Sequence, residues 1–284
     1  MMVRTLVCSG LLWLTMTATA ATDPAPEQSS RPANADPAQQ VARLIRLTGL
    51  QQQLQYIPQA LRETANAPDN PTGSLLKPLL QQLMQVFDPK EMLAILSTDL
   101  LQRLDVSTLL DALQWYRSTD GQALVRAQQQ AASPAVLEKT TAVLESQQPA
   151  ISNQRQVLIR EMIQASRADA MALDLMVNLQ AAFTSGLGNM IAPAQTPDFA
   201  RLHEQFAGTR EQLAPQLQHQ LLLQQSVALE QLSDATLASF VQFARSGSGQ
   251  RLFQALRAAM DHTVQTMARR IPQQIQSSRA APAP

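Results

Sequence analysis

The sequence contains little charge, few aromatic side chains and only one cysteine. Charged residues make up 15% of its 284 residues and cancel to a formal net charge of +0. This balance excludes the large basic surface that nucleic-acid binding requires, so we expect no nucleic-acid partner. With 45% hydrophobic residues, the chain can instead bury a sizeable core.

The single cysteine, Cys8, lies in an N-terminal segment that has the order of a secretory signal peptide. Arg4 precedes an apolar run from Leu6 to Ala18, and small residues follow up to Ala20. The run is shorter than the roughly 20 apolar residues that span a bilayer. We expect residues 1–20 to be cleaved off and the mature protein to be periplasmic, without stable membrane insertion and without cysteine chemistry.

Glycine is scarce, at 9 residues, and no segment has the sustained alternation that is typical of strands. A leader of residues 21–36 is too poor in apolar residues to fold. Beyond it, apolar residues recur at helical spacing, as from Leu44 to Leu54. Three pairs of an N-capping residue and a first-turn proline indicate helix starts: Asp36-Pro37, Asp88-Pro89 and Ser133-Pro134. The sequence therefore predicts an all-α fold.

One segment recurs at a constant spacing of 128 residues, which places Arg245 opposite Arg117 and Leu252 opposite Leu124. Weaker similarity continues upstream of both copies. Such self-similarity predicts two tandem helical-bundle modules that are related by internal duplication. The predicted divisions are residues 37–148 for the first module, 149–166 for a helical connector, 167–276 for the second module and 277–284 for a disordered tail.

The repeated segment carries the junction Arg-Ser-x-x-Gly-Gln-x-Leu. Its residues are Arg117, Ser118, Gly121 and Gln122 in the first copy and Arg245, Ser246, Gly249 and Gln250 in the second. We interpret it as a structural corner, in which the serine or its neighbour caps the next helix and the glycine lets two helices approach closely. In the first copy, Thr119 and Gln122 have the spacing of a capping box. The alternative is an anion or ligand site, because first-turn amides would lie beside an arginine.

Bulky side chains precede the junction in both copies. Tyr116 belongs to the apolar face of its helix, where the second copy has Ala244. Trp115 and Phe243 lie about 100° away, at the edge of that face. We expect each of them to cover the helix that follows.

The junction and the helix before it resemble a known family. A helix that ends in Trp115-Tyr116-Arg117-Ser118 and continues into x-x-Gly-Gln is similar to the bacterial domain-of-unknown-function family 2059, which consists of small exported helical domains. The resemblance covers Leu104 to Leu124 and returns over Leu232 to Leu252. Family members usually have Ser-Pro at the corner, whereas this chain has Ser118-Thr119 and Ser246-Gly247. The resemblance implies a helical exported domain and no particular activity.

No pattern of catalytic or metal-binding residues is present in the sequence. The three histidines, His203, His219 and His262, do not pair at helical spacing, and no nucleotide-binding or nucleophile-elbow motif occurs. We therefore expect no metal, no cofactor and no enzymatic activity. The catalytic alternative is a cell-wall glycan hydrolase, in which Glu145 would be a buried general acid.

These features favour a non-catalytic binding or envelope-maintenance factor. They allow a protein partner in the cell envelope, and they allow a homo-oligomer. A second alternative is a carrier that holds an apolar ligand between the two modules. Met171, Met176 and Met190 would offer such a ligand an adaptable lining, because the unbranched thioether side chain fits irregular shapes.

Overall fold

The computed structural model describes residues 36–52, 54, 58, 73–131, 133–149 and 151–280. Most of these residues are helical and none of them forms a strand, which confirms the predicted all-α fold. The predicted signal peptide and nearly all of the leader lie outside the described residues. The helices are α2 (Pro37–Leu47), α4 (Gly73–Val86), α5 (Pro89–Arg103), α6 (Val106–Arg117), α7 (Thr119–Gln130), α8 (Pro134–Ser146), α9 (Asn153–Ala165), α10 (Ala168–Ile191), the 3-10 turn η2 (Pro193–Gln195), α11 (Phe199–Ala207), α12 (Arg210–Ala228), α13 (Asp234–Arg245), α14 (Gly247–Ala268) and α15 (Ile271–Ala280).

The predicted helix starts are confirmed at all three proline pairs. The Asp36 carboxylate accepts a hydrogen bond from the Ala38 N–H at 3.0 Å, and Asp88 accepts one from the Lys90 N–H at 2.7 Å. Ser133 is the N-cap of α8, although its side chain makes no capping hydrogen bond. The proline that follows each cap needs no N–H partner, because first-turn amides have no acceptor within the helix.

Two helix ends differ from the sequence prediction. The first helix does not run on towards Leu54 but stops at Thr48, because Gly49 has a φ of 64° that a continuing helix cannot contain. At the other end of the chain, α15 continues to Ala280. It therefore includes residues 277–280 of the segment that was predicted to be a disordered tail.

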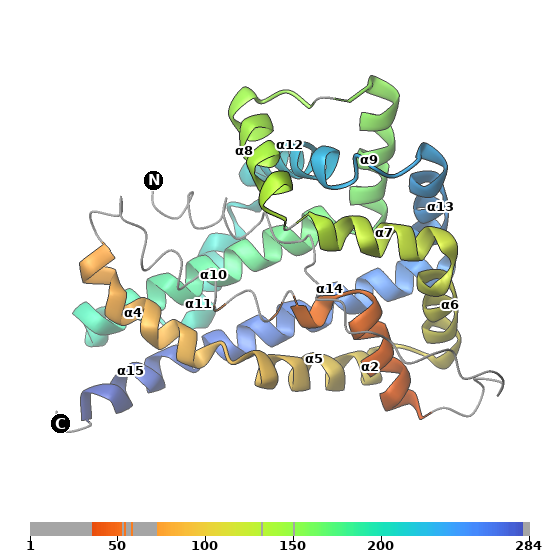
Figure 1. The fold of residues 1–284 in the computed structure, drawn as a ribbon. Helices are drawn as coiled ribbons and strands as arrows, with labels where there is room; N and C mark the ends of the chain where they lie inside the picture. Colours follow the sequence, from red (N-terminus) through yellow and green to blue (C-terminus); the bar gives the residue numbers. More distant parts are fainter. Residues whose placement is uncertain are drawn as a thin grey trace.

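The two predicted modules share one hydrophobic core. A single cluster of buried side chains extends from Val41 in α2 to Ile275 in α15. The long helices α10 and α14 run beside each other through the molecule (Figure 1). From the second half, α14 packs on α5 and α6, while α7 and α8 of the first half pack on α13 and α12. The halves are therefore interlocked.

Helix α9, which lies within the predicted connector, is a core helix. It packs on α13 much as α2 packs on α6, and its Ile159 is fully buried. The ends of α2 and α9 also match: Thr48 Oγ1 donates to the Leu44 carbonyl at 2.9 Å, and Ser166 Oγ donates to the Met162 carbonyl at 2.8 Å. A residue with positive φ follows in both places, Gly49 at 64° and Arg167 at 55°. By packing and by capping, α9 has the position in the second half that α2 has in the first.

Candidate functional site

Serine caps the second helix at both corners. Ser118 Oγ accepts a hydrogen bond from the Gly121 N–H at 3.1 Å, and Ser246 Oγ accepts one from the Gly249 N–H at 3.0 Å. The two serines also share extended backbone angles, with φ of −64° and −65°. In each corner one first-turn amide is thus paired with the capping serine, as the interpretation of the junction as a structural corner predicts.

The two glycines allow the close approach that the sequence predicts. A Cβ atom on Gly121 would lie 2.2 Å from the Trp115 carbonyl oxygen, and one on Gly249 would lie 2.0 Å from the Phe243 carbonyl oxygen. Both distances are far below van der Waals contact, and the obstructing atoms belong to the backbone. Only glycine therefore fits these positions without moving one helix away from the other.

The two glutamines have a role that the sequence analysis missed. Gln122 Nε2 donates to the Tyr116 carbonyl at 2.6 Å, and Gln250 Nε2 donates to the Ala244 carbonyl at 2.6 Å. Each glutamine thus satisfies a carbonyl in the last turn of the preceding helix, where backbone acceptors lack partners. The predicted capping box of Thr119 and Gln122 is wrong, because Ser118 is the N-cap.

The two corners face each other. The rings of Trp115 and Phe243 stack with centroids 4.9 Å apart and planes 10° apart, so each covers its equivalent in the other half. Phe243 also contacts the helix that follows it, because its ring lies 6.3 Å from that of Phe253 in α14. On one side Thr236 Oγ1 donates to Asp120 at 2.9 Å, and on the other Arg251 Nε donates to Thr108 Oγ1 at 2.7 Å. The repeated junction is therefore the contact between the two halves of the molecule.

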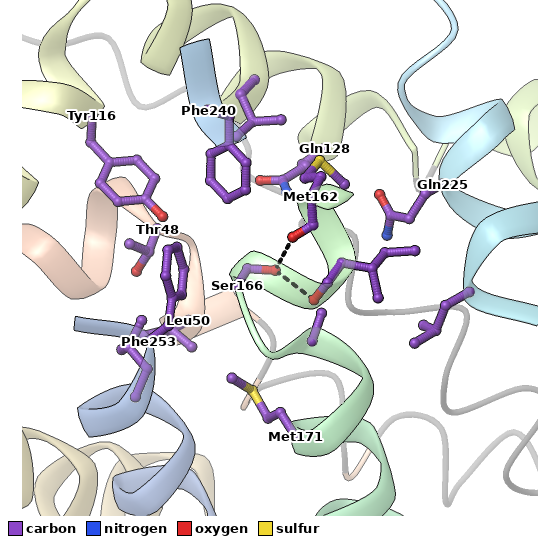
Figure 2. Close-up of a pocket in the computed structure, with 15 residues that line it drawn as sticks. Thr48, Leu50, Tyr116, Gln128, Met162, Ser166, Met171, Gln225, Phe240 and Phe253 are labelled. Atoms are coloured by element: carbon purple, nitrogen blue, oxygen red, sulfur yellow. Dashed lines mark hydrogen bonds between the residues drawn. The ribbon is translucent and has the colours of Figure 1, made fainter. Parts of the chain in front are cut away.

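A cavity of about 110 Å³ lies where both halves and α9 meet, and we call it the junction cavity (Figure 2). Its described lining residues come from both halves of the chain, from Thr48 and Leu50 in the first half to Leu256 in α14. Most of the lining is apolar. The polar side chains in it are Thr48, Tyr116, Gln128, Ser166 and Gln225.

Thr48 and Ser166 are already engaged in capping their helices, as the dashed lines of Figure 2 show for Ser166. Tyr116 differs from them, because the residue is only 6% exposed and no described residue forms a hydrogen bond with its hydroxyl. Burial raises the pKa of this phenol above its ordinary value. The hydroxyl therefore stays protonated and can donate a hydrogen bond into the cavity.

Gln225 supplies the second unengaged polar group. The residue is 6% exposed, and its Oε1 is buried without a hydrogen-bond partner among the described residues. A buried amide oxygen that lacks a donor costs roughly 1–3 kcal/mol. Because Gln225 lines the cavity, a rotation of its amide group would present this oxygen to a ligand that carries a donor.

The other candidates from the sequence lie outside this site, apart from Met171, which lines the cavity. Met176 is buried elsewhere, and Met190 is partly buried against the core. Glu145 is exposed in the last turn of α8 and does not line this cavity. It therefore lacks the burial that the predicted general acid requires. Within the described ranges no three or more His, Cys, Asp or Glu side chains lie together as metal ligands would, and no helix there is long and apolar enough to cross a membrane.

Sequence reasoning did not identify Tyr116 and Gln225 as cavity residues. Tyr116 had the spacing of a core residue, and Gln225 belongs to a glutamine-rich helix with no motif around it. Their separation along the chain means that only the tertiary packing brings them together. Comparisons with protein-family models, with curated proteins and with solved structures gave no significant match for this chain, so the resemblance to family 2059 stays a prediction.

Proposed function

We propose that this protein is a non-catalytic binding protein that holds a small, mostly apolar ligand in the junction cavity. The observation that carries this proposal is the unpartnered amide oxygen of Gln225 in the wall of a cavity that is otherwise mainly apolar. Ligand sites commonly combine apolar walls with a few polar groups that fix orientation. Of the functions considered from the sequence, this favours the carrier of an apolar ligand between the two halves.

The lining defines the chemistry of the ligand. An apolar cavity of about 150 Å³ can hold benzene, so a cavity of about 110 Å³ suits a short alkyl group or one end of a larger molecule. The Gln225 oxygen requires a donor, and the Tyr116 hydroxyl offers one. A donor on the ligand would satisfy Gln225, and an acceptor on it would satisfy Tyr116.

Native mass spectrometry of the protein purified from its own cells tests this proposal. We expect the wild-type protein to retain a small-molecule mass, and Ala168→Phe, which fills the cavity, to lose it. Gln225→Leu should retain less ligand, because it removes the polar anchor. Gln224→Leu is the matched control: Gln224 is also buried, at 3% exposure, and does not line the cavity. Equal retention in all four proteins, or no retained mass in the wild type, would contradict the proposal.

We also propose that the protein is exported to the periplasm and that its halves are diverged copies of one exported helical module of the kind that family 2059 contains. The matching hydrogen bonds at the two corners and at the ends of α2 and α9 support the duplication. Cell fractionation and the intact mass of the mature chain test the export. A mature chain that begins at Ala21 is expected, and a cytoplasmic protein that retains residues 1–20 would contradict it.

A further inference from the structure

A second concave region lies between α2 and α6. It is a groove of about 690 Å³ that shares no described lining residue with the junction cavity. Arg43 and Arg46 of α2 and Arg117 of α6 line it, and we call it the arginine groove. No carboxylate is found among its described lining residues, so three cations face one open space.

The positive charges of this groove are not neutralised by the described part of the protein. None of the three arginines forms an ion pair with a described residue. Burial lowers the pKa of Arg117, and the positive charge of Arg43 lowers it further. Asp111 lies on the same helix as Arg117 but does not pair with it. Its carboxylate accepts a hydrogen bond from the Ser248 hydroxyl at 2.5 Å. The two helices are therefore packed together in spite of a repulsion between like charges.

The second half of the molecule contains the same helix pair without this repulsion. Alignment of α9 with α2 on their end residues, Ser166 and Thr48, places Glu161 at the position of Arg43. Arg245 has the position of Arg117, and it forms an ion pair with Glu161 at 3.5 Å. The helix pair can therefore be built with opposite charges. The cationic version in the first half needs a reason other than the packing of the two helices.

We propose that the arginine groove binds a phosphate group carried by a small soluble molecule or by a lipid headgroup. Guanidinium groups donate paired hydrogen bonds that match phosphate oxygens, and three of them supply more positive charge than one carboxylate ligand needs. Gln39 and Gln114 also line the groove and add amide donors. Leu110, which is half-buried, gives apolar surface for the organic part of the ligand. This site is independent of the ligand proposed for the junction cavity.

Two measurements on the full chain test this proposal. The first compares its melting temperature in glycerol phosphate with that in glycerol. The second compares its sedimentation with phosphatidylglycerol vesicles and with phosphatidylcholine vesicles. A rise in melting temperature with glycerol phosphate identifies a soluble phosphate ester, because a ligand that binds only the folded state stabilises it. Sedimentation with anionic vesicles alone identifies a lipid headgroup. Absence of both effects in the wild type would overturn the proposal.

Variants separate binding from folding. Arg43→Glu copies the charge pair of the second half, so it should raise the melting temperature without ligand and weaken phosphate binding by about tenfold or more. Arg117→Gln should weaken binding to a similar degree. Arg245→Gln removes the equivalent arginine outside the groove and should leave the affinity unchanged. If Arg245→Gln lost as much affinity as Arg117→Gln, the phosphate would be held by general charge, and the arginine groove would not be the site.

Discussion

At the corner between α6 and α7, each residue of the junction except the arginine has a local structural role. Ser118 caps α7, Gly121 clears the backbone of α6, and Gln122 satisfies the Tyr116 carbonyl. Leu124 is buried in the core. The same roles recur around Ser246, which explains why this combination of residues can be recognised twice in one chain. Arg117 alone has no such local role. A ligand bound in the arginine groove would explain why an arginine is present at this position.

The glycine positions can be tested one at a time. Gly121→Ala and Gly249→Ala should each lower the free energy of unfolding by about 1–3 kcal/mol, because the added Cβ would press on backbone that cannot rotate away. Urea titration followed by circular dichroism measures the change. Gly247→Ala is the control, since its Cβ would lie 3.5 Å from the Arg251 side chain, and alanine favours a helix. If all three variants lost the same stability, close helix contact would not be the cause.

The N-cap of α6 makes stability depend on acid pH. Hydrogen bonds from the Thr108 N–H and the Ser107 hydroxyl lower the pKa of Asp105 from 3.8 to about 2. The ionised form is therefore favoured in the folded state. Its stabilising contribution is complete above pH 4 and is lost as the pH falls towards 2.

Asp105→Asn isolates this contribution, because asparagine also caps helices well but carries no charge. The variant should melt at a lower temperature than the wild type at neutral pH, and the difference should shrink between about pH 4 and pH 2. Thermal melts across this range measure it. A difference that persists unchanged at pH 2 would mean that shape, and not charge, is responsible.

At the scale of the helices, the sequence predicted starts better than ends. Asp36, Asp88 and Ser133 act through short-range contacts that a sequence pattern contains, so these helix starts were predictable. The end of α2 was not predictable, because apolar residues continue at helical spacing through Leu50 although Gly49 breaks the helix. A single glycine is a weak signal when apolar spacing continues on both sides of it.

The role of α9 and the junction cavity could not be predicted in the same way. Little in the sequence of α9 resembles that of α2, and only its packing on α13 shows the correspondence. The cavity combines Tyr116, Met171 and Gln225, which come from three separate helices. Methionine could be proposed as a lining residue from its chemistry alone. The unpaired Gln225 oxygen depends on which groups surround it, and a sequence does not contain that information.

One side chain of α9 holds the chain segment that leads into α13. Arg155 donates to the Leu229 carbonyl at 2.6 Å and to the Leu232 carbonyl at 2.7 Å, and it pairs with Asp234. Its side chain is only 13% exposed. A guanidinium can serve these acceptors together because its donors form a fixed fork.

Arg155→Lys should therefore lower the free energy of unfolding by roughly 1.5–3 kcal/mol, although the charge is kept. Hydrogen exchange should show faster opening of residues 229–233 before the rest of the molecule. Arg160→Lys, an exposed change on the same helix, is the control and should have little effect. Equal losses in the two variants would show that the hydrogen bonds to this segment contribute little.

At the scale of the whole molecule, the interlocked helices set how the chain unfolds. Because α14 packs on α5 and α6 while α7 and α8 pack on α13 and α12, we expect that neither half keeps its core when the other is removed. Trp115 and Phe243 stack across the contact between the halves, where α6 meets α13. The halves are therefore expected to unfold together, in contrast to two modules joined by a linker.

A chain that begins at Ala21 allows this to be measured, because Trp115 is then its only tryptophan. Its fluorescence reports the contact between the halves, and far-ultraviolet circular dichroism reports the helices of both. The two signals should change at the same urea concentration, in one transition. A fragment of residues 151–280 should lack this cooperative transition, since its α13 and α14 would expose the surfaces that α7, α5 and α6 cover. Two separated transitions in the full chain, or a cooperatively folded fragment, would mean that the halves are independent domains and that the contact at Trp115 only joins them.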